Sequence, residues 1–230
     1  MIWFTKPTIK IAACYCVYDD YEFLEQSINS IINHVDEIYF FIPFGEESED
    51  NEKVLDIVGK VKCKVFRKEW SNDYRNIALD IVEDAGFQYC LMIDPNNIWD
   101  KKSLDNLIKF QKLNKSIEVF TTRFYNYYKK SCYRINPIQS LKAISLIKTN
   151  IRFNGDKVKD KHGTYNISLW DVCWHDVSFL RSDEKIRAVI NDEEWYEKYW
   201  LNWTTEMINF HPVVGEEFHS VVEVKGIFDS

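Results

Sequence analysis

The sequence predicts an α/β fold in which a mostly parallel central sheet is flanked by helices. In the first half of the chain, short apolar runs alternate with longer stretches of helical spacing, which is typical of this fold class. The run at 9–17 (IKIAACYCV) has the composition of an interior parallel strand that is buried on both faces. Polar residues directly follow the run at 88–93, and open α/β sheets bind ligands at the carboxyl ends of their strands.

The predicted elements of this half follow one another in a regular order. Strands are expected over 9–17, 37–43, 62–66 and 88–93, and helices over 21–33, 51–58, 72–85 and 104–113. In the first helix, Ile28 and Ile31 fall on one apolar stripe. The acidic pair Asp19 and Asp20 precedes this helix, where an N-cap is favoured. Pro95 ends the fourth strand because proline cannot donate to a β-ladder.

The second half of the chain has a different character. The alternation over 118–134 predicts a long, half-exposed strand or a hairpin, and hence a small antiparallel section. Five of the chain's eight tryptophans lie between 170 and 203, in a stretch that predicts a C-terminal helical segment packed on the sheet. Because no flexible linker and no internal repeat is evident, we expect residues 1–230 to form a single domain.

Composition and charge restrict the classes of function. The chain has 230 residues, of which 46% are hydrophobic, enough for a core and unlike a disordered protein. With 29 Lys and Arg against 36 Asp and Glu, its net charge of −7 argues against bulk nucleic-acid binding. No apolar stretch approaches the roughly 18 residues that cross a bilayer, so no stable membrane insertion is expected. The six cysteines lack paired zinc spacing, and a disulfide framework is not expected at this chain length, which predicts a reducing, cytoplasmic location.

Two motifs contain residues that could bind a metal ion, a phosphate or a base. In MIDPNNIW (92–99), Asp94 and Asn96 can offer a carboxylate and an amide oxygen to Mg²⁺ or Mn²⁺ from one tight turn, although such a turn also commonly caps the next helix. In NDYRNIAL (72–79), Arg75 lies near the start of a helix, where a phosphate or a base edge could be bound. A surface salt bridge is the alternative interpretation of Arg75.

The order of these segments resembles family 2 glycosyltransferases of the GT-A fold. The matching segments are the first strand, the helix YDDYEFLEQSI, the strand DEIYFF, the helix NDYRNIAL and the strand end CLMIDPNN, which span about residues 8–110. The resemblance implies a nucleotide-sugar donor, with a UDP-sugar favoured, across the carboxyl ends of the sheet. It also implies an Asp-x-Asp motif that holds a divalent metal, Mn²⁺ or Mg²⁺, on the diphosphate. Residues 1–115 would then form the nucleotide-sugar-binding half, and 116–230 the acceptor half.

Positions that match the family carry expected roles with them. Asp94 and Asn96 would take the Asp-x-Asp role, with Asn96 at a position where the family usually has Asp. Arg75 would contact the nucleotide. Val17 and Tyr18, at the end of the first strand, would lie beside the nucleobase, and Asp20 would also belong to the donor-binding residues.

A later segment, WHDVSFLRSDEKI (174–186), is similar to an H-x-x-S-x-x-R pattern found in some small glycosyltransferases of this type. The similarity implies that His175 completes the metal shell and that Arg181 offsets charge on the leaving diphosphate. For the base that removes the acceptor proton, Asp176 is favoured and Asp171 is second. Trp170 and Trp174 flank this segment and could stack on a sugar, although core packing explains such aromatic residues equally well.

Two other functions remain open on the sequence alone. One is a degenerate protein that binds a nucleotide-sugar without turnover, which Asn96 and Asp176 suggest as departures from the family pattern. The other is a nucleotidyltransferase that uses the same sheet end for a nucleoside triphosphate. The acceptor of a sugar transfer is left open.

Overall fold

The computed structural model describes residues 9–44, 49–69, 71, 73–136, 142–155, 157–158, 166–190, 192–204, 209–210, 217–218 and 220–228. The first half contains β1 (Ile11–Cys16), α1 (Leu24–Ile31), β2 (Glu37–Phe44), α2 (Glu49–Val58), β3 (Lys64–Glu69), α3 (Tyr74–Asp84), β4 (Tyr89–Ile93), β5 (Asn97–Trp99) and α4 (Lys101–Leu113). Every helix and strand predicted for this half is present, and β5 is an additional short strand.

The second half contains more strands than its sequence predicts. It comprises β6 (Val119–Tyr128), β7 (Lys130–Asn136), β8 (Lys142–Lys148), β9 (Phe153–Asn154), β10 (Lys157–Val158), β11 (Asn166–Asp176), a 3₁₀ turn η1 (Ser178–Leu180), α5 (Asp183–Ile190), α6 (Glu193–Trp195), a π-helical turn η2 (Tyr196–Leu201), β12 (Asn209–Phe210), β13 (Glu217–Phe218) and β14 (Ser220–Glu223). The expected hairpin at 118–134 is formed by β6 and β7, which pair antiparallel.

The central sheet has the strand order β14-β7-β6-β8-β4-β1-β2-β3. Strand β1 pairs parallel with both β2 and β4, and β2 pairs parallel with β3. Strand β8 joins β4 and β6 antiparallel, and β11 pairs parallel with β6 and antiparallel with β5. The predicted sheet is thereby confirmed, with a parallel part and an antiparallel section beside it.

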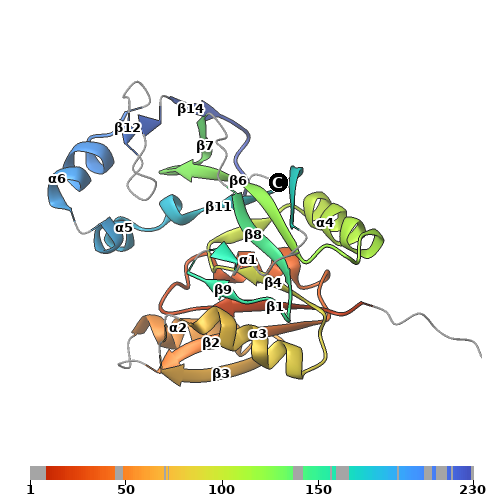
Figure 1. Ribbon diagram of the computed structural model, residues 1–230. Coiled ribbons are helices and arrows are strands. Elements are labelled where there is room, and N and C mark those ends of the chain that lie inside the picture. Colours follow the sequence, from red (N-terminus) through yellow and green to blue (C-terminus); the bar gives the residue numbers. More distant parts are fainter. Residues whose placement is uncertain are drawn as a thin grey trace, which may run out of the picture.

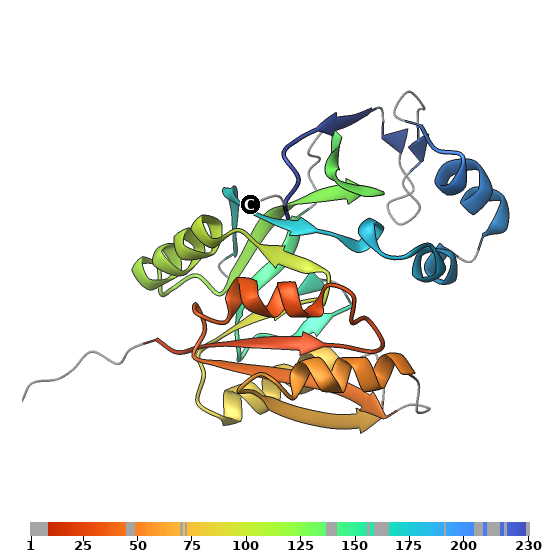
Figure 2. The same ribbon diagram turned by 180° about the vertical axis from the view of Figure 1, so that it is seen from behind.

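Helices cover both faces of the parallel part. Side chains of α1, α2 and α4, such as Leu24, Val54 and Leu104, pack against one face of the sheet. On the other face, α3 contributes Ala78, Leu79 and Val82. All of β1 up to Tyr15 is buried, as the composition of its strand indicated. Figure 1 shows these layers at one end of the molecule, with β7, β14, α5 and α6 at the other, and Figure 2 shows the same division from behind.

A separate aromatic cluster stabilises the C-terminal segment. Tyr128, at the end of β6, packs with Phe179 and Trp200, and its hydroxyl donates to the Tyr199 carbonyl over 2.5 Å. Trp195 and Trp203 pack against this cluster. Three of the five tryptophans of this stretch therefore belong to a local core. Across the described residues, no helix has both the length and the apolar character that crossing a membrane requires.

The acidic pair before α1 does not cap that helix. Helix α1 begins at Leu24, and its N-cap residue Phe23 makes no side-chain capping bond. Asp20 instead pairs with Arg181, which follows η1. A carboxylate at this position therefore joins the loop after β1 to the C-terminal segment.

Candidate active site

The strand order leaves a crevice at the carboxyl ends of β1 and β4. The chain runs outward from β1 through β2 to β3 and then returns to place β4 on the other side of β1, and ligands bind at such a switch point in open α/β sheets. Cys16 ends β1, and Asp94 follows β4. Both residues line a cavity of about 510 Å³.

The cavity brings together residues that are far apart in the sequence. Arg75 comes from the first turn of α3, Asp94 and Asn96 from the turn between β4 and β5, and Asp176 from the end of β11. These are four of the residues that the sequence singled out. A cation, two carboxylates and a side-chain amide therefore face one space.

Aromatic rings hold the Arg75 guanidinium. Its central carbon lies 5.7 Å from the centre of the Tyr74 ring and 5.5 Å from that of Phe153, so the cation is placed against two ring faces. Asn76 fixes Phe153, because its Oδ1 accepts from the Phe153 N–H over 2.7 Å and its Nδ2 donates to the Phe153 carbonyl over 3.2 Å. Arg152 donates to Glu83 over 2.9 Å and so ties the same loop to α3.

The Asp-Pro-Asn-Asn turn fixes Asp94 at the cavity wall. The Asp94 N–H donates to Asn97 Oδ1 and the Asn97 N–H donates to the Asp94 carbonyl, each over 3.0 Å. The pKa of the neighbouring Cys16 thiol responds to the charges of both Asp94 and Arg75. Burial raises the pKa of Cys16, the Asp94 carboxylate raises that pKa further, and the Arg75 guanidinium opposes the rise. The Asp94 carboxylate and the Arg75 guanidinium therefore both lie close enough to Cys16, at the end of β1, to change the pKa of its thiol.

Asp176 is a buried carboxyl with well-defined partners. Its Oδ1 accepts the Ser178 N–H over 3.0 Å, the Asn96 Nδ2 over 3.2 Å and the Ser178 hydroxyl. Burial raises the pKa of Asp176, the hydrogen bonds from Ser178 lower it, and the Asp94 carboxylate raises it again. A carboxylate in this environment has an increased affinity for a proton, as a general base requires.

His175 lies on the other side of β11 from the cavity. Successive side chains of a strand point to opposite faces, and Trp174 and Asp176, which flank His175, both line the cavity. The His175 Nδ1 is 2.8 Å from the Tyr127 hydroxyl, and burial lowers the pKa of His175. The structure therefore does not bring His175 together with Asp94 and Asn96, contrary to the expected metal shell.

Arg181 and Asp171 are also outside the cavity wall. Arg181 pairs with Asp20, and both side chains are largely buried, at 15% and 16% exposed. Burial raises the pKa of Asp20, and the Arg181 guanidinium opposes this rise. Asp171 is exposed, at a register shift of β11 between Leu169 and Cys173. Of the two candidate bases, the structure places only Asp176 at the cavity.

The two residues after β1 occupy contrasting environments. Val17 is fully buried, and its N–H donates to the Phe41 carbonyl over 3.0 Å. Tyr18 is 55% exposed. Neither belongs to the described residues that line the cavity.

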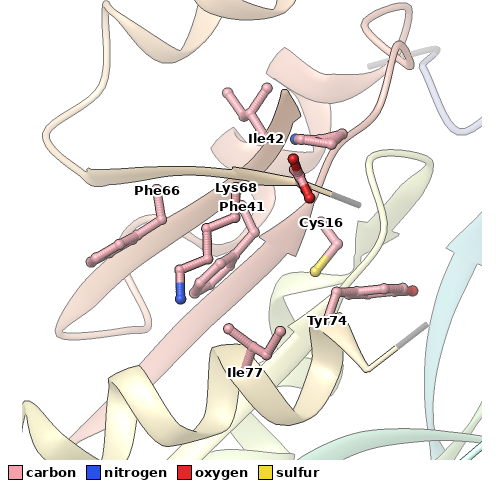
Figure 3. Close-up of a pocket in the computed structure, with 9 residues that line it drawn as sticks. Cys16, Phe41, Ile42, Phe66, Lys68, Tyr74 and Ile77 are labelled. Carbon is pink, nitrogen blue, oxygen red and sulfur yellow. The ribbon is translucent and has the colours of Figure 1, made fainter. Parts of the chain in front are cut away.

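A small apolar pocket adjoins the cavity. It has a volume of about 30 Å³ and lies between the ends of β1, β2 and β3 and the start of α3. Figure 3 shows the side chains of Phe41, Phe66 and Ile77 around it, with Cys16 and Tyr74 at one side. Cys16 and Tyr74 also line the larger cavity, so the two spaces share a wall. Sequence reasoning missed this pocket because its apolar residues have the pattern of a core.

The two tryptophans expected to contact a ligand differ. Trp174 lines the cavity, stacks on Phe124 with ring centres 4.6 Å apart and donates from Nε1 to Thr122 over 3.1 Å. Trp170 is 50% exposed, and the Arg123 guanidinium lies 4.0 Å from its ring centre. Only Trp174 can therefore contact a molecule in the cavity.

The donor set fits a divalent cation only in part. In the segments that the structure describes, no group of three or more His, Cys, Asp or Glu side chains is arranged to hold a metal. The cavity does present two carboxylates, Asp94 and Asp176. Mg²⁺ is commonly held by one or two carboxylates together with substrate phosphates. The residues present therefore fit a cation that is bound together with a diphosphate.

Comparison with known proteins gives evidence on the fold. No family model matches the chain, and no curated protein matches it. Among solved structures, S. aureus TarS 1–349 in complex with UDP is 14% identical, with a TM-score of 0.50 over 79% of this chain and 63% of that one. Another S. aureus TarS structure is 15% identical, with a TM-score of 0.49 over 82% of this chain and 40% of that one.

A cytidylyltransferase from Leptospira borgpetersenii serovar Hardjo-bovis (strain JB197) is 15% identical, with a TM-score of 0.42 over 62% of this chain and 61% of that one. This chain therefore spans less than two thirds of the length of each of these three structures. At such identities the likeness concerns the fold alone. The likeness to the TarS complex with UDP, at a TM-score of 0.50, confirms that the chain has a GT-A-like α/β fold.

Proposed function

We propose that this GT-A-like protein is a glycosyltransferase that moves a sugar from a UDP-sugar to an acceptor hydroxyl. The observation that carries the proposal is the convergence of Arg75, Asp94 and Asp176 on one cavity at the carboxyl ends of β1 and β4. In this proposal residues 1–230 act as one domain. Residues 1–115 bind the nucleotide-sugar, and residues 116–230 supply the acceptor side.

The two adjoining spaces suit the two parts of a nucleotide. The small pocket of Figure 3, at about 30 Å³, has room only for the edge of a nucleobase, against apolar and aromatic side chains such as Phe41 and Tyr74. The larger cavity offers the Arg75 cation to the diphosphate. Cys16 and Tyr74 line both spaces, so a nucleotide bound in the larger cavity would lie next to the small pocket.

A divalent cation, Mn²⁺ or Mg²⁺, is the proposed cofactor. Asp94 would hold it together with the donor phosphates, which leaves Asp176 free of the cation. When bound, the cation neutralises charge on the diphosphate. Arg75 has the same effect, because its guanidinium is held in the cavity wall by Tyr74 and Phe153.

Asp176 is the proposed base. The acceptor oxygen attacks the sugar carbon while the bond from that carbon to the diphosphate breaks, and the acceptor proton passes to Asp176. The hydrogen bonds from Ser178 and Asn96 to Oδ1 fix the orientation of this carboxylate. Arg181 is not among the described residues that line the cavity, but its guanidinium, paired with Asp20, opposes the rise that burial causes in the pKa of Asp176.

Donor binding and product identity test the proposal. UDP and a panel of UDP-sugars, each with and without Mn²⁺, should raise the melting temperature of the protein, because a ligand of the folded state stabilises it. Asp94→Ala should abolish this rise, and Asp171→Asn should leave it unchanged. A productive UDP-sugar and acceptor should release UDP.

Two results would contradict the proposal. Release of pyrophosphate from a nucleoside triphosphate would identify a nucleotidyltransferase. Tight UDP-sugar binding without UDP release for any acceptor in a broad panel of sugars, alcohols and lipids would identify a binding protein without turnover.

A further inference from the structure

We infer that Asn96 positions the Asp176 carboxylate and does not supply a ligand to the metal. The inference rests on the proposed function, and it assigns Asn96 a role different from that of the Asp residue that the family resemblance implies at this position. It concerns a side chain that is only 8% exposed, between the β4–β5 turn and the end of β11.

The hydrogen bonds of the Asn96 amide nitrogen carry the inference. Nδ2 donates to Asp176 Oδ1 over 3.2 Å and also to the Ser178 hydroxyl oxygen. The Ser178 hydroxyl directs its one proton to the same Asp176 oxygen. Asn96, Ser178 and Asp176 therefore form a closed triangle of polar contacts.

This triangle fixes which end of the Asn96 amide faces Asp176. A carboxylate oxygen only accepts, and the Ser178 hydroxyl has already given its proton to that oxygen. An amide oxygen turned toward Asp176 would face a second acceptor with no proton between the two. The amide nitrogen must therefore face Asp176.

The amide oxygen of Asn96 has a partner of its own. Oδ1 accepts from Asn97 Nδ2 over 3.3 Å, and Asn97 Oδ1 in turn accepts the Asp94 N–H. The Asn96 carbonyl accepts the Val177 N–H over 3.0 Å, and Asn97 is in register with Asp176 in the β5–β11 ladder. Main-chain and side-chain contacts thus hold Asn96 on Asp176.

An aspartate at position 96 would act against this arrangement. Its carboxylate would face the Asp176 carboxylate with no proton to donate, so the contact would change from attractive to repulsive. Asparagine is therefore the residue type that suits this position. Asp94 then remains as the ligand that the motif supplies to the metal.

The contact is tested first by thermal unfolding, which requires no substrate. Asn96→Ala and Ser178→Ala should each lower the melting temperature by about 2–4 °C. The double variant should lower it by less than the sum of the two, because the residues share one network. Asn202→Ala provides a matched control, since Asn202 bonds to the Glu197 carbonyl elsewhere, and its effect should add to that of Ser178→Ala. Additivity of Asn96→Ala with Ser178→Ala would overturn the inference.

The role is tested with Mn²⁺ and UDP. In calorimetry on the UDP-bound protein, Asn96→Ala should retain Mn²⁺ affinity within about twofold, whereas Asp94→Ala should lose it. In turnover of a UDP-sugar, Asn96→Ala should lower kcat by about 10- to 100-fold with little change in the donor KM. Asn96→Asp, which restores the family residue, should also lower kcat.

The outcomes separate the inference from the proposed function. A loss of Mn²⁺ affinity in Asn96→Ala, or full turnover in Asn96→Asp, would show that position 96 serves the metal and would overturn the inference. If UDP does not bind to the unsubstituted protein, the proposed function fails. The unfolding experiment then still decides whether Asn96 holds Asp176.

Discussion

The parallel half of the molecule (residues 11–113) and its C-terminal region (residues 177–204) are stabilised by different interactions. The parallel half buries apolar side chains on both faces of its sheet, with Leu24, Leu79 and Leu104 fully buried. The C-terminal region has a small aromatic cluster around Tyr128 and Trp200.

The contacts that join the C-terminal region to the loop after β1 and to α2 are polar. Arg181 pairs with Asp20, and Glu22 accepts the Ser182 N–H over 2.8 Å. Lys185 donates to Asp50 over 2.6 Å. A fully buried leucine stabilises a fold by about 1.5–3 kcal/mol, whereas a largely buried ion pair such as Arg181–Asp20 gains little because its attraction is offset by the cost of desolvating both charges. The parallel half is therefore the stable support, and the C-terminal region is attached to it less firmly.

In the proposed function, the same difference separates donor binding from proton transfer. The parallel half supplies Arg75 for the diphosphate and Asp94 for its cation, and the end of β11, which leads directly into the C-terminal region, supplies Asp176. We expect substitutions in the two regions to affect different measured quantities.

The largest expected effect is on turnover. Asp176→Asn keeps the shape of the side chain but removes the base, so kcat should fall by about 10²- to 10⁴-fold. UDP affinity, measured by calorimetry, should change little because Asp176 faces the acceptor side. Asp171→Asn, at an exposed position of the same strand, is the control. Equal turnover in the two variants would contradict the division between binding and chemistry.

The next effect is on global stability. Leu79→Ala removes a fully buried side chain of α3 and should lower the free energy of unfolding by about 2–5 kcal/mol in denaturant titrations. Leu113→Ala, at a residue that is 76% exposed, should change it by less than about 0.5 kcal/mol. Similar losses in both variants would show that the core of the parallel half is not the main support.

A smaller effect is expected on nucleotide affinity. Arg75→Met keeps the packing between Tyr74 and Phe153 but removes the cation, which should weaken UDP binding by about 1.5–3 kcal/mol in calorimetry. Lys109→Met, on the exposed side of α4, changes the net charge equally and is the control. An unchanged affinity in Arg75→Met would place the diphosphate elsewhere.

Loss of the Arg181–Asp20 pair should increase hydrogen exchange only near the pair. Arg181→Met should increase hydrogen exchange in α5 while that of β1 and β4 stays unchanged, because the pair joins the C-terminal region to the loop after β1. Arg187→Met breaks the exposed pair with Glu193 within the C-terminal region and should leave exchange in α5 nearly unchanged. A global increase after Arg181→Met would instead indicate one cooperative unit.

The smallest expected effect is a gain in stability. Burial raises the pKa of Asp176, so the folded protein favours the protonated carboxyl, and its ionisation destabilises the folded state as pH rises above the ordinary range of aspartate. Asp176→Asn should therefore raise the melting temperature at neutral pH. The gain should disappear at low pH, where Asp176 is protonated in both folded and unfolded states. A lower melting temperature at neutral pH would contradict this expectation.

The parallel half could be predicted from the sequence because its periodicities are local. The run at 9–17 and the stripe of Ile28 and Ile31 report burial within single elements, and β1 and α1 follow from them. The pairing of β11 with β5 and β6 depends on contacts between distant segments. No local pattern encodes those contacts.

For the candidate site, the sequence predicted which residues take part better than it predicted which way their side chains point. Asp94, Asn96, Arg75 and Asp176 were singled out by their chemistry, and the fold places them at one cavity. His175 was expected beside them, yet strand periodicity already implied that neighbouring side chains face apart. Once Asp176 is placed at the cavity, His175 cannot face the same way. The pairing of Asp20 with Arg181 had no signal in the sequence.

The short β5–β11 ladder has a consequence for substrate entry. Asn97 is paired with Asp176, and the Asn96 carbonyl accepts the Val177 N–H, so backbone bonds link the turn that carries Asp94 to the strand end that carries Asp176. A movement of the C-terminal region that lets an acceptor enter would therefore begin beyond Ser178, whose N–H and hydroxyl are themselves bonded to Asp176. The two carboxylates would keep their spacing through each such opening.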